Sequence, residues 1–148
     1  MAITVVRPVE SHRPAWEALY AGYAAFYAVA QTPDMRARVW SWIHDPGETV
    51  ECFLAVAADG APIGLAHFRE FARPLAASRG GYLDDLFVDP SARGSGAADA
   101  LFAALGDEAR RRGWSVIRWI TADDNYRARS LYDKVATRTP WVTYDLSP

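Results

Sequence analysis

The sequence predicts a mixed α/β domain in which helices cover both faces of one sheet. Three observations lead to this class. Apolar residues recur with helical spacing in several segments, short β-branched or aromatic runs lie between those segments, and Asp59-Gly60 joins two of the runs as a hairpin turn would. The expected order is β-α-α-β-β-β-α-β-α-β, an antiparallel meander that continues into a βαβ unit.

The N-terminal part is expected to hold one strand and two helices. Residues 3–7 are a β-branched run that Pro8 ends. A stripe of apolar and aromatic side chains at helical spacing then predicts the first helix: Trp16, Leu19, Tyr20, Tyr23 and Tyr27. Thr32-Pro33-Asp34 has the composition of a helix start, so residues 35–43 are expected to form the second helix.

The central part is expected to be strands. Residues 51–58 and 62–71 are the two arms of the predicted hairpin. Residues 72–81 contain Pro74 and a pair of glycines, and we expect a loop there. Residues 82–88 are the next predicted strand, which Asp89-Pro90 stops.

The C-terminal part is expected to alternate helices and strands. Apolar residues from Ala98 to Ala109 predict a helix that Gly113 ends, and residues 116–120 predict a buried strand. Ala128, Leu131, Tyr132 and Val135 mark a last helix. Residues 141–146 are expected to form a final strand.

Length and composition suit one globular domain, residues 1–148. Half of the chain is hydrophobic (51%) and 23% is charged, which argues against disorder. The formal net charge is −2, with an isoelectric point of about 5.9, so nothing indicates a nucleic-acid partner. The short basic run Arg110-Arg111-Arg112 is expected at a helix end, where cations offset the helix dipole.

Other classes of protein and site find no support in the sequence. Cys52 is the only cysteine, which excludes an internal disulfide and a cysteine-zinc cluster. The three histidines are far apart in the chain, so we expect no metal. No segment has the length of a signal peptide's apolar core or of a membrane span, and we expect a cytoplasmic protein without a membrane partner.

A glycine-containing turn is the first candidate binding site. Arg93-Gly94-Ser95-Gly96-Ala97-Ala98 lies where a predicted strand passes into a predicted helix. Small residues let a ligand approach the backbone, and amides at a helix start favour an anion such as a phosphate. A P-loop would require Gly-Lys-Ser/Thr where Ala97-Ala98 stand, and a dinucleotide fingerprint would require a small residue where Asp99 stands. A plain turn without a ligand is the alternative.

Two motifs resemble one family. The turn, with Arg93, Gly96 and Ala98 in place, resembles the acyl-CoA-binding motif Arg/Gln-x-x-Gly-x-Gly/Ala of the GCN5-related N-acetyltransferases. Residues 125–134, NYRARSLYDK, are similar to that family's Asn-x-x-Ala-x-x-Leu-Tyr-x-Lys segment. The resemblance covers essentially the whole chain. One departure is that Val135-Ala136 follow where the family usually continues with Gly-Phe, which affects the last strand and the acceptor pocket.

The resemblance implies that acetyl-CoA is the acetyl donor and assigns roles to particular residues. The backbone of Arg93, Gly94, Ser95, Gly96, Ala97 and Ala98 would bind the pyrophosphate. The strand Leu86-Phe87-Val88 would pair with the pantetheine arm, and Asn125 would hold the cofactor from the last helix. Tyr132 is the candidate general acid for the departing sulfur, because a phenol can donate a proton while remaining neutral at pH 7. The alternative is that Tyr132 is a core residue of an amphipathic helix.

The candidate general bases are Asp84 and Asp85. Simple alternation places the two carboxylates on opposite faces of one strand, and only one of them would face the acceptor cleft. We favour Asp84. Glu70 and His67 on the preceding strand are further options, each more typical of an ordinary sheet residue, whereas His12 and His44 are expected at the surface.

The acceptor is expected to be a small primary amine, such as a polyamine or an amino acid. The N-terminal helices and residues 72–81 would form its side of the cleft in this family. Six aromatic side chains there suit a cation: Tyr20, Tyr23, Phe26, Tyr27, Trp40 and Trp42. Core packing or a dimer contact is the alternative for each ring, and a homodimer is a possible assembly. The alternative functions are acetylation of a protein or peptide amine and a non-catalytic acyl-CoA-binding module.

Overall fold

The computed structural model describes residues 2–148 and contains one five-stranded sheet with the strand order β1-β2-β3-β4-β5. The strands are β1 (Thr4–Val6), β2 (Val50–Val56), β3 (Pro62–Arg73), β4 (Ser78–Val88) and β5 (Ile117–Arg118). Neighbours from β1 to β4 are antiparallel, and β4 pairs with β5 in parallel. The predicted meander followed by a βαβ unit is therefore confirmed.

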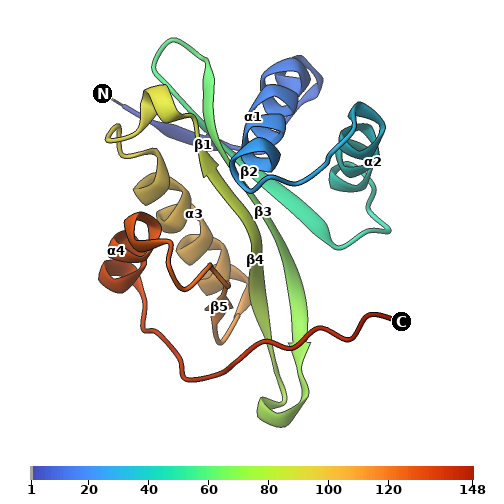
Figure 1. Cartoon of the computed structure of the whole chain (residues 1–148), viewed down its shortest axis with the longest axis vertical. Helices are drawn as coiled ribbons and strands as arrows, with labels where there is room; N and C mark the ends of the chain where they lie inside the picture. The colour runs from blue at the N-terminus through green and yellow to red at the C-terminus, as the bar shows by residue number, and fades with distance from the viewer. Residues whose placement is uncertain (1) are drawn as a thin grey trace.

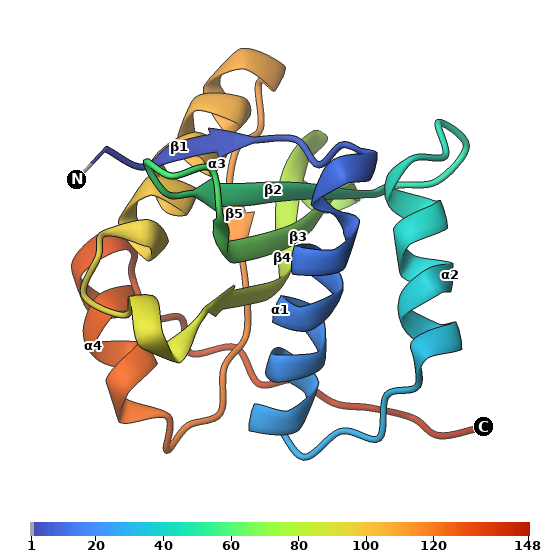
Figure 2. The same cartoon turned by 90° about the horizontal axis from the view of Figure 1, so that it is seen from above.

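Four helices flank this sheet: α1 (Arg13–Phe26), α2 (Pro33–Ile43), α3 (Ala97–Arg112) and α4 (Tyr126–Val135). Figures 1 and 2 show α1 and α2 on one side of the sheet and α3 and α4 on the other. Thr32 caps α2 as its sequence suggested, because its hydroxyl accepts a hydrogen bond from the backbone N–H of Met35 at 3.2 Å. No helix in the described part of the chain is long and apolar enough to cross a membrane.

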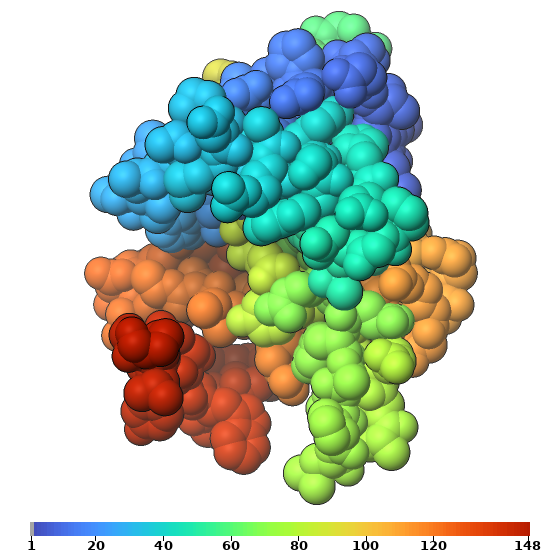
Figure 3. Space-filling model, turned by 90° about the vertical axis from the view of Figure 1, so that its right-hand side faces the viewer, coloured from blue at the N-terminus to red at the C-terminus, as the bar shows by residue number. Residues whose placement is uncertain are grey.

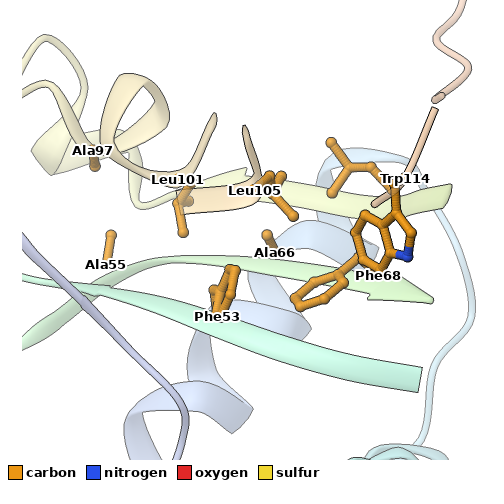
Figure 4. Close-up of a cluster of buried hydrophobic side chains, with 9 residues drawn as sticks. Phe53, Ala55, Ala66, Phe68, Ala97, Leu101, Leu105 and Trp114 are labelled. Atoms are coloured by element: carbon orange, nitrogen blue, oxygen red, sulfur yellow. The ribbon is translucent and has the colours of Figure 1, made fainter. Parts of the chain in front are cut away.

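Each face of the sheet has its own core. On the α3 side, Leu101 and Leu105 pack against Phe53, Phe68 and the indole of Trp114, and Figure 4 shows these side chains meeting between helix and strands. On the other side, a second cluster brings helix and strand residues together: Trp16, Leu19, Trp40, Cys52, Leu54, Val56, Leu65 and Phe87. Cys52 is buried in that cluster.

The prediction of a loop at residues 72–81 is wrong. β3 and β4 continue through this region to form one long hairpin, which closes at the short 3₁₀ turn Pro74–Ala76. Gly80 and Gly81 lie inside β4, where the backbone approaches neighbouring side chains too closely for a β-carbon. The glycine pair therefore serves packing within the sheet.

The final strand expected at residues 141–146 is also absent. The chain after α4 has no regular secondary structure, and its large apolar side chains are exposed, among them Trp141 at 81% and Leu146 at 94%. In Figure 3 this tail (red) projects apart from the β3–β4 hairpin (light green). The segment has strand-forming residues, but no neighbouring strand supplies the hydrogen-bond partners that a sheet requires.

Candidate active site

The glycine turn connects β4 to α3. Gly96 is the N-cap of α3 with a φ of +89°, and Gly94 has a φ of +83°, a region that favours glycine. A β-carbon at either position would meet no atom within 4 Å, so the space above the turn is open. The first amides of a helix have no partners within the helix, and the turn therefore exposes backbone donors that suit an anion.

Arg93 and the end of α1 lie together. The guanidinium carbon of Arg93 is 5.7 Å from the centre of the Phe26 ring. The next residue, Tyr27, accepts a hydrogen bond of 3.5 Å from the side-chain amide of Asn125, which caps α4 by accepting from the N–H of Ala128. The end of α1 thus lies between the glycine turn and the start of α4.

The edge of β4 beside the turn has no strand partner on one side. β5 pairs with β4 only at Gly81 and Tyr82, so Leu86, Phe87 and Val88 have β3 on one side and no strand on the other. An unpaired edge offers backbone donors and acceptors to an extended ligand. The predicted ligand-binding strand therefore has a free backbone edge that can form hydrogen bonds with an extended ligand.

Tyr132 is half-buried on α4. Its ring meets those of Phe102 and Trp119 edge-on, with centroids 6.0 and 5.4 Å away. Burial, with a smaller contribution from Tyr27, raises the pKa of Tyr132 to about 12. The phenol is therefore fully protonated at neutral pH and is available as a donor.

Asp84 and Asp85 lie on the same face of the sheet, which corrects the alternation argument. His67 of β3 is opposite Asp85, but the next residue, Phe68, is opposite Leu83, so Asp84 is an extra residue in a β-bulge. The bulge reverses the alternation. Leu83 packs in the core beneath α3, whereas both carboxylates line the side of the sheet covered by α1 and α2.

The two carboxylates have different partners. Asp84 pairs with Arg69, its Oδ2 lying 3.1 Å from the guanidinium Nε at the surface. Oδ2 of Asp85 is 2.9 Å from Nδ1 of His67 and accepts a 3.0 Å hydrogen bond from the hydroxyl of Tyr20. Asp84 thus pairs with a guanidinium near the surface, whereas Asp85 is held by two donors within the protein.

These environments move the two pKa values in opposite directions. Burial raises the pKa of Asp84 above its ordinary value, although Arg69 acts in the other direction. Burial would also raise the pKa of Asp85, but hydrogen bonds from His67 and Tyr20 outweigh it and hold that pKa below its ordinary value. Burial and the charge of Asp85 raise the pKa of Tyr20, which therefore remains a hydrogen-bond donor.

Both carboxylates open into a pocket of about 310 Å³ between the sheet and the first two helices. It has three acidic side chains, one basic side chain and aromatic walls. Its lining is Tyr20, Val39, Trp42, Glu48, Thr49, Val50, His67, Arg69, Asp84 and Asp85. A cationic group with an apolar body fits this chemistry.

The model of the acetyltransferase (GNAT) family matches residues 16–136. The chain belongs to this family. A curated relative, the D-amino-acid N-acetyltransferase HPA3 of Saccharomyces cerevisiae, is 31% identical over 144 residues, covering 95% of this chain and 88% of that protein. The family membership that the two motifs suggested is therefore confirmed, and the protein is an acyltransferase.

Solved structures share the GNAT fold over the full chain. A ribosomal-protein-alanine N-acetyltransferase from Brucella melitensis biovar Abortus 2308 is 24% identical with a TM-score of 0.81, and 99% of each chain is covered. AAC(6')-Iy in complex with the bisubstrate analogue CoA-S-monomethyl-acetylneamine is 20% identical with a TM-score of 0.83, covering 100% of this chain and 99% of that one. At these identities the likeness supports the fold alone.

Within this GNAT domain, the aromatic residues expected around the acceptor separate into three groups. Tyr20 and Trp42 line the pocket. Trp40 and Tyr23 pack in the core on this side of the sheet: Trp40 lies on Trp16, with ring centroids 5.0 Å apart, and Tyr23 meets Phe87 edge-on at 5.9 Å. Phe26 and Tyr27 lie beside Arg93 and Asn125, and so belong with the glycine turn and α4.

The other titratable candidates also divide. Glu70 bonds to the indole N–H of Trp114 at 2.8 Å, away from the acidic pair, and is structural. His67 lies in the site, whereas sequence reasoning favoured an ordinary sheet residue. Arg69 was not foreseen, although its position two residues after His67 on β3 places it on the same face. No group of three or more metal-binding side chains occurs within residues 2–148.

Proposed function

We propose that this protein transfers the acetyl group of acetyl-CoA directly to the primary amine of a small cationic molecule within a ternary complex. The observation that carries the proposal is the bulge in β4, which puts Asp84 and Asp85 side by side in one pocket with opposite pKa shifts. Acetyl-CoA supplies an acetyl group already activated as a thioester.

The glycine turn and the β4 edge provide the donor site of this proposal. Amides at the start of α3, with Arg93 beside them, bind the pyrophosphate, and the open edge at residues 86–88 pairs with the pantetheine arm. Asn125 stands at the N-terminus of α4, joined to Tyr27. The open space above both glycines supports close approach of a ligand to this backbone.

The two carboxylates have separate roles in the proposed mechanism. Asp85, with its lowered pKa, remains ionised and attracts the cationic acceptor. Asp84, with its raised pKa, accepts a proton from the ammonium, directly or through water. The free amine then forms the new C–N bond as the C–S bond breaks, and Tyr132 donates its proton to the departing sulfur. The acylated nitrogen loses its remaining extra proton, which restores the phenol of Tyr132.

The charge of the pocket favours an acceptor with a cationic group and a compact body. Its three carboxylates face a single guanidinium, and Tyr20 and Trp42 add aromatic surface. A D-amino acid is one candidate by analogy with the yeast relative, since Arg69 could meet its carboxylate. A polyamine is the other, because it would match the excess of negative charge.

The test is release of free thiol from acetyl-CoA with a panel of D-amino acids, L-amino acids, polyamines and lysine-containing peptides. Thiol release with a small amine, together with the acetylated product by mass spectrometry, supports the proposal. Turnover with peptides alone would identify a peptide acetyltransferase. Acetyl-CoA binding without release for any amine would indicate a non-catalytic module.

Gly96→Ala is expected to weaken acetyl-CoA binding about tenfold, because alanine is strained at a φ of +89° and its methyl group would occupy the space proposed for the pyrophosphate. Calorimetry measures the Kd. Gly60→Ala is the matched control, since Gly60 has the same φ and equally open surroundings in the β2–β3 turn. Gly60→Ala should lower stability by a similar amount and leave the Kd for acetyl-CoA unchanged. Equal Kd values in the two variants would show that the glycine turn is not part of the donor site.

Tyr132→Phe is expected to lower kcat about tenfold or more at saturating acetyl-CoA, with the Kd for acetyl-CoA nearly unchanged. The phenylalanine ring keeps the edge-on contacts with Phe102 and Trp119 and removes only the donor. Steady-state kinetics and calorimetry measure the two effects. An unchanged kcat would exclude Tyr132 as the general acid.

A further inference from the structure

A continuous line of hydrogen bonds runs from the core of the protein to the acceptor pocket. The indole Nε1 of Trp16 is 3.0 Å from Nε2 of His67, and Nδ1 of His67 is 2.9 Å from Oδ2 of Asp85. Trp16 is fully buried and His67 is 1% exposed, whereas the side chain of Asp85 is 18% exposed at the pocket. His67 thus connects a rigid core residue to a carboxylate that a ligand can reach.

The partners of His67 determine its tautomer. An indole N–H can only donate, so Nε2 of His67 must be the acceptor in this contact. The ring proton is therefore on Nδ1, from which it is donated to Asp85. Trp16, which is itself wedged between the rings of Tyr20 and Trp40, keeps the imidazole in this form.

We infer that His67 is a positioning residue for the acceptor amine: held by Trp16, it fixes the carboxylate of Asp85 at the pocket through its Nδ1–H. This inference rests on the proposed function. Tyr20 donates to the same oxygen from α1, so two donors on different elements set the rotation of the carboxylate. Such fixed placement of a charge is what a site needs to hold an ammonium group in one geometry.

Besides His67, several titratable or charged groups lie around Asp85 or line the same pocket. They come from every element packed around it: Tyr20 and Tyr23 on α1, Glu48 before β2, Cys52 on β2, Arg69 on β3 and Asp84 on β4. Among these groups, only Tyr20 also donates a hydrogen bond to Oδ2 in the structure, and Tyr20 is half-buried. His67 is fully buried and is held in place by a second core residue, Trp16. Loss of the histidine N–H should therefore raise the pKa of Asp85, because a donor to its ionised form is removed.

The test compares His67→Leu with His67→Asn. Leucine removes both hydrogen bonds, whereas the side-chain amide of asparagine can place an N–H near the position of Nδ1. In His67→Leu we expect the KM for the amine to rise about tenfold or more, with a smaller change in kcat. In His67→Asn the KM should return close to the wild-type value. Rates are divided by the concentration of acetyl-CoA binding sites measured by calorimetry, so that misfolded protein does not affect the kinetic constants.

A second measurement does not depend on catalysis. Carbon NMR of the aspartate carboxyls follows the titration of Asp85 in the wild type, His67→Asn and His67→Leu, and the Asp85 resonance should titrate at higher pH in His67→Leu. If His67→Leu does not fold, Trp16→Phe replaces it, and nitrogen NMR of the imidazole should then show loss of the pure Nδ1-protonated form.

The two measurements separate the possible failures. A raised titration of Asp85 without acetylation of any amine would support the positional role and reject the proposed function. Normal acetylation with unchanged KM and unchanged titration of Asp85 would overturn the inference. A fall in melting temperature with both readouts unchanged would show that His67 only stabilises the fold.

Discussion

Replacing Asp84 with asparagine is expected to lower kcat about 100-fold or more, because asparagine has the same shape but cannot accept the proton of the acceptor ammonium. The carboxylate of Asp84 pairs with Arg69 at the surface, so the loss of this ion pair should change the stability of the protein little. The pKa of Asp84 is raised above its ordinary value. The wild-type rate should therefore fall as pH decreases through that raised pKa, where the base becomes protonated. The asparagine variant should lack this acidic limb in its pH–rate profile.

Asp85→Asn distinguishes the two carboxylates. Asp85 is held ionised by His67 and Tyr20, so its loss should chiefly raise KM for the amine and leave the acidic limb in place. Asp107→Asn is the surface control, since Asp107 lies on α3 with its side chain 77% exposed and should change neither constant. A pH profile that loses its acidic limb in Asp85→Asn and keeps it in Asp84→Asn would reverse the two roles.

The bulge at Asp84 explains why sequence reasoning placed the acidic pair only approximately. Side chains alternate between the two faces of a strand with a period of two residues, and this alternation holds only while the two paired strands keep their register. The additional residue in β4 shifts Asp85 and Phe87 to the face opposite Leu83. Nothing in the letters Leu83-Asp84-Asp85-Leu86 marks such an insertion, because the partner strand decides where it falls.

Local features were predicted well. Glycines followed by small residues at the start of a helix have the same conformational freedom wherever they occur, and Gly94 and Gly96 do adopt positive φ. Features that depend on distant partners were not. The partners of His67 are 51 and 18 residues away in the chain, so its role could not be seen from its neighbours. The tail failed for the same reason, because a strand needs an edge to pair with and residues 141–146 meet none in the structure.

Gly81→Ala is expected to destabilise the protein by about 2 kcal/mol, which would lower Tm by about 4–8 °C. A β-carbon at this position would lie 2.5 Å from two atoms of the Trp114 ring. The ring cannot readily move away, because its N–H bonds to Glu70 at 2.8 Å and the guanidinium of Arg112 covers it at 4.6 Å. The clash must therefore be relieved by displacing β4 itself. Thermal unfolding followed by circular dichroism measures the effect.

Gly106→Ala is the matched control. Gly106 lies inside α3, where a β-carbon would only touch the side chain of Arg110 at 3.6 Å, and alanine there should stabilise the protein by about 0.5–1 kcal/mol. Gly81 is also opposite Ile117, at one of the two positions where β4 and β5 remain paired before their separation opens the β4 edge proposed to bind acetyl-CoA. Displacement of β4 in Gly81→Ala should therefore weaken acetyl-CoA binding as well. A variant as stable as the wild type would show that Trp114 can shift, and that the close approach of β4 to this ring does not hold the two strands together.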